Sequence, residues 1–130
     1  MRYLLDTHVA LWATYQSRRL STRARELLSR EDAEAHISAA SLWEIALKNT
    51  MQPGGLPPVR QAIADFAKAG FRELAVTSQA TIVLETLPAI HKDPFDRMLV
   101  SQASAEALVL VTGDEKLGAY DPEEHFILLV

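Results

Sequence analysis

Short apolar runs alternate with helical patterns along the whole chain, and this alternation constrains the fold more than any other feature. Buried strands are predicted where the runs lie, at residues 2–5, 35–38, 71–76, 108–111 and 126–129. Helices are predicted between them, at about 8–13, 22–29, 39–49, 59–69, 78–86 and 94–107, with a short helical turn near residue 117. Strands that alternate with helices usually pair in parallel. The sequence therefore predicts an α/β fold, a three-layer sandwich with a mainly parallel central β-sheet flanked by helices.

The length and the composition limit the class of protein. A chain of 130 residues can bury one substantial core but not two, so we expect a single domain over residues 1–130. The absence of cysteine excludes a disulfide framework and Cys-ligated zinc. No apolar run resembles a signal peptide or a transmembrane span, so we expect a cytoplasmic protein without a membrane partner.

The stretch His91–Val100 gathers two carboxylates, a histidine and an arginine around the predicted start of a helix. Pro94 suits the first helical position and Asp93 suits the N-cap. Asp96 then falls in the first turn, near the positive end of the helix dipole. Taken alone, the stretch is explained by a well-capped helix.

Four acidic residues are expected at one edge of the predicted sheet. Their number argues against helix capping as the whole explanation of the stretch 91–100. Ligands of such folds collect beyond the carboxyl ends of the parallel strands, where Asp6 and Asp114 follow two of the strands. Glu44 lies in the helix after the second strand, and Asp96 lies in the first turn of its own helix. Asp6 and Asp114 can each be an N-cap. Four acids that converge on one edge are harder to explain by capping alone.

Glu44 also has a simpler explanation. Ser41-x-x-Glu44 matches a capping box, and Ser41, Glu44 and Lys48 form a stripe that a solvated helix face would carry. However, the neighbours of Glu44 at 42, 43, 45 and 47 are all apolar, so we expect this carboxylate to be shielded from water. A shielded carboxylate needs a partner, which a divalent cation would supply.

The clustered acids predict a metal-dependent reaction. Carboxylates in one site resist ionising together unless cations neutralise them. A net charge of −4 argues against a protein that binds nucleic acid by bulk electrostatics, but bound cations would reverse the local field. Oxygen ligands without cysteine or paired histidines favour Mg²⁺ or Mn²⁺ over zinc. Such ions orient phosphates and activate water, which makes phosphodiester hydrolysis the expected reaction.

Four blocks of sequence carry a resemblance to a known family. They are Tyr3-Leu4-Leu5-Asp6-Thr7-His8, Ile37-Ser38-x-x-Ser41-x-Trp43-Glu44-Ile45, His91-x-Asp93-Pro94-Phe95-Asp96-Arg97 and Leu110-Val111-Thr112-x-Asp114. Together they resemble the PIN-domain family, and more narrowly the VapC-type toxins of type II toxin–antitoxin pairs. The blocks span nearly the whole chain in the right order, and the third is the most specific.

The resemblance implies a PIN-like fold and a Mg²⁺- or Mn²⁺-dependent endoribonuclease. It further implies a toxin that is usually a homodimer and is inhibited by a small cognate antitoxin. The family's four acidic positions fall on Asp6, Glu44, Asp96 and Asp114, as both catalytic and metal-binding residues. Thr112 matches a position whose hydroxyl often supports the metal site.

Three other residues are candidates for a supporting role. Asp93 and Glu115 could also bind the metal ion, but both rank below the four acids. Asp93 is better explained as a helix cap. Arg97 could contact phosphate or pair with a site acid, and a structural salt bridge is equally consistent with its position. Stacking on bases is a candidate role of Trp12, Tyr15 and Trp43, and guidance of RNA is a candidate role of Arg18 and Arg19.

Three alternatives remain open beside the metal-dependent ribonuclease. An aspartyl phosphotransferase also has acids at strand ends, but it needs a second acid near Asp6 that this chain lacks. A catalytically silent PIN-like module would bind only RNA or a partner. Two of the four histidines could instead act as a general acid and base on RNA, leaving a cyclic 2′,3′-phosphate. Hydrolysis by metal-activated water would leave a 5′-phosphate and a 3′-hydroxyl.

Overall fold

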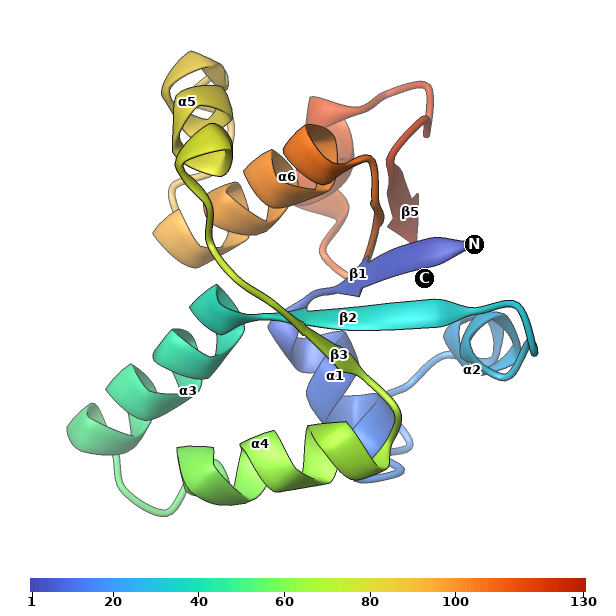
Figure 1. Cartoon of the computed structure of the whole chain (residues 1–130), viewed down its shortest axis with the longest axis vertical. Helices are drawn as coiled ribbons and strands as arrows, with labels where there is room; N and C mark the ends of the chain where they lie inside the picture. The colour runs from blue at the N-terminus through green and yellow to red at the C-terminus, as the bar shows by residue number, and fades with distance from the viewer.

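A five-stranded sheet forms the centre of the protein, for which a computed structural model describes all 130 residues. The strand order is β3-β2-β1-β4-β5, and every neighbouring pair is parallel (Figure 1). The strands are β1 (Arg2–Leu5), β2 (Glu34–Ser38), β3 (Arg72–Leu74), β4 (Val109–Thr112) and β5 (Ile127–Leu129). The carboxyl ends of β1, the central strand, and of its neighbour β4 therefore lie side by side.

Helices cover both faces of the sheet (Figure 1). One layer contains α1 (Thr7–Thr14), α2 (Thr22–Leu28), α3 (Ala39–Met51) and α4 (Val59–Lys68), and the other contains α5 (Ser78–Thr86), α6 (Pro94–Glu106) and the 3₁₀ helix η1 (Glu115–Tyr120). Two apolar cores separate the three layers: Tyr3 and Leu5 of β1 pack in one, and Leu4 packs in the other. This is the side-chain alternation of a strand buried on both faces. The predicted fold class is confirmed.

Local capping chemistry sets where the helices begin. The side chains of Asp6, Ser21 and Thr77 each accept a hydrogen bond from the backbone N–H three residues further on. Asp93 caps α6, and Pro94 occupies its first position, as the sequence predicts. No helix of the protein is both long enough and apolar enough to cross a membrane.

Two local predictions are wrong. The third strand covers three residues rather than 71–76, because it is an edge strand that pairs only with β2 and carries the exposed residues Arg72 and Glu73. The capping box at Ser41 is also wrong. Ser38 caps α3 by accepting from the N–H of Ala40, so Ser41 lies inside the first turn, where it is buried.

Candidate active site

Asp6 and Asp114 meet because β1 and β4 are neighbours in the sheet. Asp6 directly follows β1, and Asp114 lies two residues beyond β4. The hydroxyl of Thr112, the last residue of β4, donates to Asp6 Oδ2 and accepts from the backbone N–H of Asp114 at 3.1 Å. Thr112 thus holds the two acids together across the neighbouring strands β1 and β4.

Each of these two acids caps a helix with one oxygen and leaves the other for the site. Asp6 Oδ1 accepts from the N–H of Val9 at 2.8 Å, and Asp114 Oδ1 accepts from the N–H of Lys116 at 2.9 Å. The Oδ2 atoms lie among the other site groups instead. Because a carboxylate has two oxygens, capping and a role in the site are compatible.

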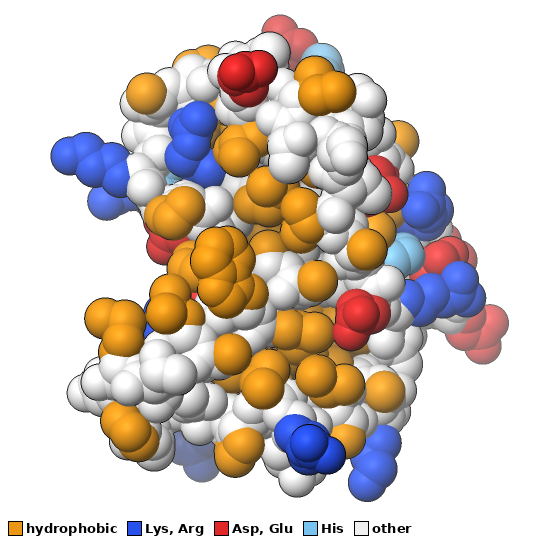
Figure 2. All heavy atoms as spheres, turned by 60° about the vertical axis from the view of Figure 1, so that its left-hand side comes forward, with side chains coloured by type: hydrophobic (Ala, Val, Ile, Leu, Met, Phe, Trp, Pro, Cys, Tyr) orange, Lys and Arg blue, Asp and Glu red, His pale blue; other side chains and the backbone are white.

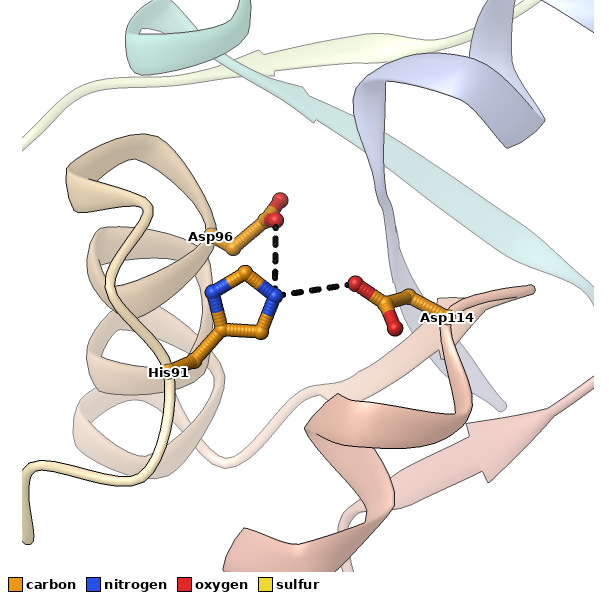
Figure 3. Close-up of side chains that lie close together, drawn as sticks. All are labelled: His91, Asp96 and Asp114. Atoms are coloured by element: carbon orange, nitrogen blue, oxygen red, sulfur yellow. Dashed lines mark hydrogen bonds and ion pairs between the residues drawn. The ribbon is translucent and has the colours of Figure 1, made fainter.

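Asp96 completes the cluster from the first turn of α6. The side chains of Asp96, Asp114 and His91 point toward one another, and one ligand atom of each lies within 4.8 Å of the other two (Figure 3). His91 Nε2 is 3.0 Å from Asp114 Oδ2 and 3.6 Å from Asp96 Oδ2. The Asp96 carboxylate itself accepts no hydrogen bond, unlike those of Asp6 and Asp114.

His91 was not predicted as a site residue. Its Nδ1 accepts the backbone N–H of Asp93 at 3.0 Å, so in the neutral ring the hydrogen is on Nε2. His91 therefore donates to Asp114, and a protonated Nε2 has no lone pair to offer a metal ion. Its place in the most specific sequence block was the one available signal, because its partner Asp114 lies 23 residues further along the chain.

Asp93 and Arg97 do not face the acidic cluster as ligands. Asp93 Oδ1 caps α6 by accepting from the N–H groups of Phe95 and Asp96. Arg97 donates to the carbonyl of Pro88 at 2.8 Å and to Tyr120 Oη at 2.9 Å. Pairing with a site acid, one of the alternatives that the sequence leaves open for Arg97, does not occur, because adjacent residues of a helix point about 100° apart. Arg97 instead holds the segment that precedes α6 in place through its hydrogen bond to Pro88.

Glu44 is buried, with a side chain only 5 % exposed, so a solvated stripe does not describe it. Its Oε1 accepts from the Thr7 hydroxyl at 2.7 Å, and its Oε2 lies 2.6 Å from Lys48 Nζ. The sequence predicts a divalent cation as the partner of this shielded carboxylate, but the structure places Lys48 there, one turn along α3. Glu115 is exposed in η1 and contacts none of the other acids.

The pKa shifts of Asp6 and Asp96 show that these two acids and Glu44 are close neighbours. Burial, together with the charges of Asp93, Asp6 and Glu44 and against the opposing effect of His91, raises the pKa of Asp96 to about 7. Burial also raises the pKa of Asp6. Burial acts to raise the pKa of Asp114, but hydrogen bonds from His91 and from the Lys116 backbone lower it overall. The cluster therefore resists full ionisation on its own.

The donor set fits a hard divalent cation. Asp96 and Asp114 each place a carboxylate oxygen within 4.8 Å of the other and of His91, and Asp6 lies close enough for its charge to raise the pKa of Asp96. Carboxylates from three different elements thus gather at this edge of the sheet, which suits Mg²⁺ or Mn²⁺. The Asp96 carboxylate has no ion-pair partner besides His91, and the raised pKa of Asp6 and of Asp96 reflects the burial and repulsion that a cation would offset.

Known proteins resemble the chain over nearly its whole length. Ribonuclease VapC22 of Mycobacterium tuberculosis (strain ATCC 25618 / H37Rv) is 29% identical over 119 residues, which cover 90% of each protein. The fold is similar to VapBC2 from Rickettsia felis bound to a DNA fragment from its promoter, with a TM-score of 0.71, 16% identity, and coverage of 99% of this chain and 98% of that one. A toxin–antitoxin complex from Klebsiella pneumoniae matches with a TM-score of 0.64, 19% identity, and coverage of 97% and 95%.

A family match agrees with the geometry. The PIN domain model matches residues 3–122, a span that begins in β1 and ends just after η1. It includes four of the five parallel strands, without β5, and all four acids at their carboxyl edge. The predicted resemblance is confirmed: this chain belongs to the PIN domain family.

Proposed function

We propose that this chain is a VapC-type toxin of a type II toxin–antitoxin pair, a single PIN domain over residues 1–130 that hydrolyses RNA in the cytoplasm with Mg²⁺ or Mn²⁺. The gathering of Asp96 and Asp114 in one cluster, with Asp6 joined to the Asp114 backbone through Thr112, carries the proposal. The similarity to Ribonuclease VapC22 and to toxin–antitoxin complexes supports an RNA substrate and a small antitoxin partner.

In this proposal Asp6, Asp96 and Asp114 hold the metal ion. A bound divalent ion would lower the pKa of a water and stabilise the charge of an in-line displacement at phosphorus. Thr112 fixes Asp6, and His91 with the Lys116 N–H fixes Asp114. Glu44 is the fourth acid, and Lys48 balances its charge beside the other three.

The termini of the RNA products test the proposed reaction. We expect a 5′-phosphate and a 3′-hydroxyl, no cleavage in EDTA, and recovery with Mn²⁺ or Mg²⁺, as read by end-labelling and mass spectrometry of the fragments. His36→Ala and His125→Ala should keep most of their activity. His125 is exposed, and His36 is buried against the Tyr3 carbonyl on β1. A cyclic phosphate terminus, or full cleavage in EDTA, would support histidine acid–base catalysis instead.

The hydrogen-bond pattern of His91 predicts a role in positioning Asp114 rather than in ligating the ion. His91→Gln retains an N–H donor near the Nε2 position but is a poor metal ligand, so we expect its Mn²⁺ affinity to stay within about threefold of wild type. His91→Ala removes the donor and should weaken Mn²⁺ binding about tenfold. Calorimetric titration with Mn²⁺ measures both variants. Equal losses in the two variants would show that His91 is a ligand.

An apolar face offers a place for a second copy of the chain. A groove of about 360 Å³ between α3, α5 and α6 is lined mainly by apolar residues: Ala40, Trp43, Val76, Leu84, Phe95 and Met98. Trp43 is 63 % exposed there and packs edge-on against Phe95 at 4.9 Å. Figure 2 shows apolar side chains gathered across the middle of one face of the molecule. Apolar side chains that are exposed together in a groove often mark a protein–protein interface, which favours a homodimer through this groove.

The oligomeric state tests this assignment. We expect the wild type to be a dimer at tens of micromolar by light scattering, a concentration at which even weak interfaces associate. Trp43→Glu should be monomeric, because a charge in the groove would lose its hydration on association. Met51→Glu adds the same charge on the same helix outside the groove and should remain dimeric. A monomeric wild type would remove the proposed dimer.

A further inference from the structure

A hollow of about 290 Å³ lies directly beside the acidic cluster. Asp6 and Asp114 form part of its wall, and the rest comes from His8, Trp12, Arg19 and Gly113. His8 and Trp12 project from α1, and Arg19 lies in the turn that follows this helix. The hollow therefore joins two of the proposed metal-binding acids to an aromatic and basic wall that the proposed reaction does not yet use.

Trp12 gives this wall a rigid aromatic surface. Its ring packs against the backbone of Gly113, where an added Cβ would lie 3.7 Å from Trp12 Cζ3. On the other side it contacts the apolar core, so Trp12 is only half-buried and one part of the ring faces the hollow. His8, one helical turn earlier, places a second ring 5.8 Å away at a tilt of 42°. Both rings thus lie next to Asp6.

Arg19 supplies an uncommitted positive charge. Its guanidinium makes no hydrogen bond or ion pair within the protein, whereas the guanidinium groups of Arg23 and Arg25 donate to backbone carbonyls. It shares the hollow with Asp6 and Asp114 but pairs with neither. An exposed guanidinium beside an aromatic face is the combination with which proteins bind single-stranded nucleic acid, since bases stack and phosphates pair with arginine.

The size and charge of the surroundings limit the ligand. At about 290 Å³ the hollow lies at the small end of ligand pockets, which suits one nucleotide rather than several. The net charge of −4 provides no bulk attraction for RNA, so binding has to come from local contacts such as these. Because two proposed metal-binding acids line the same hollow, its occupant would lie next to the phosphate that reacts.

We propose that this hollow binds the nucleotide adjacent to the scissile phosphate of a single-stranded RNA, with the base stacked on Trp12 and a neighbouring phosphate paired with Arg19. The inference rests on the proposed ribonuclease function and adds a substrate subsite to it. Trp12 and Arg19 then act in substrate binding, whereas the acids act in the reaction.

The two tryptophans of the chain allow a direct test. Trp43→Phe leaves Trp12 as the only tryptophan, and Trp12→Phe leaves only Trp43. We expect a six-nucleotide single-stranded RNA, added in EDTA at low salt, to quench the fluorescence of Trp43→Phe by at least about a third with saturation. The fluorescence of Trp12→Phe should change little. EDTA stops the proposed reaction, so binding is measured without cleavage.

Two neighbouring arginines provide a matched pair of charge variants. Arg19→Gln in the Trp43→Phe background should weaken the RNA affinity about five- to tenfold, because the lost contact is a local one. Arg18→Gln removes the same charge one residue away, outside the hollow, and should change the affinity less than about twofold. Both side chains are exposed, so neither variant should affect folding.

The outcomes separate this inference from the proposed function. If RNA is cleaved with the expected ends but Trp12 is not quenched, or Arg18 and Arg19 behave alike, the subsite is wrong while the ribonuclease stands. If Trp12 is quenched but Mn²⁺ supports no cleavage, binding of RNA in the hollow stands, whereas the ribonuclease function and the place of the hollow beside a scissile phosphate are wrong. Equal quenching by a hexaglutamate peptide would show a general anion site and overturn the nucleotide assignment.

Discussion

Asp6→Asn is expected to reduce RNA cleavage in Mn²⁺ by at least ~10³-fold while the chain remains folded. Asp6 is the proposed ligand closest to the centre of the sheet, directly after β1, and burial raises its pKa. An amide in its place carries no charge to hold the ion, and the ion supplies several kcal/mol of transition-state stabilisation. At about 1.4 kcal/mol for each factor of ten, this loss corresponds to the stated reduction.

The same variant should not unfold the protein. The Asn oxygen can still accept the N–H of Val9 and cap α1, and the Thr112 hydroxyl can turn to accept from the amide. Asp32→Asn removes an equal charge at a side chain that is 67 % exposed, and it serves as the control with unchanged cleavage. Circular dichroism and a cleavage time course measure the two effects. Cleavage within tenfold of wild type in Asp6→Asn would contradict the carboxylate mechanism.

The sequence predicts most of the fold because the boundaries of its elements are local. Asp6, Ser21, Thr77 and Asp93 cap helices by contacts with residues two or three positions away, and such contacts are visible in a sequence. The strand predicted at 71–76 is longer than β3, because the length of β3 depends on its pairing with β2 and cannot be recognised from the local sequence. Ser38 replaced Ser41 as the cap of α3 because the strand ends directly at the helix.

The details of the site could not be predicted from the sequence alone, because they depend on contacts between residues that are far apart in the chain. The edge at which the acids meet follows from parallel strands, so the sequence predicts their neighbourhood. The partners of each acid do not follow from that pattern. Lys48 reaches the buried Glu44 along one helix, whereas His91 reaches Asp114 only because α6 and η1 are packed side by side. Arg97 is the converse case. It follows Asp96 in the sequence, which suggests that the two could pair, but the helix turns the Arg97 side chain away toward Tyr120.

The raised pKa of Asp96 predicts how the metal-free protein responds to pH. The folded-state pKa is about 7, against an ordinary value of 3.8 for the unfolded chain. Between these values the folded chain holds a proton that the unfolded chain has released. The free energy of unfolding in EDTA should therefore fall as the pH rises from about 4 to 7 and then level off. For a side chain that is 22 % exposed, the total loss is roughly 2–4 kcal/mol.

Asp96→Asn removes this penalty and should be more stable than wild type in EDTA at pH 8, by roughly 2–4 kcal/mol in chemical denaturation. The difference should shrink toward pH 4, where the wild-type carboxyl is protonated in both states. Mn²⁺ should stabilise the wild type and stabilise Asp96→Asn less, because binding to the folded state alone raises stability. Asp32→Asn should show neither effect. A lower stability of Asp96→Asn in EDTA, with an unchanged response to Mn²⁺, would mean that Asp96 serves α6 through its helix dipole and not the ion.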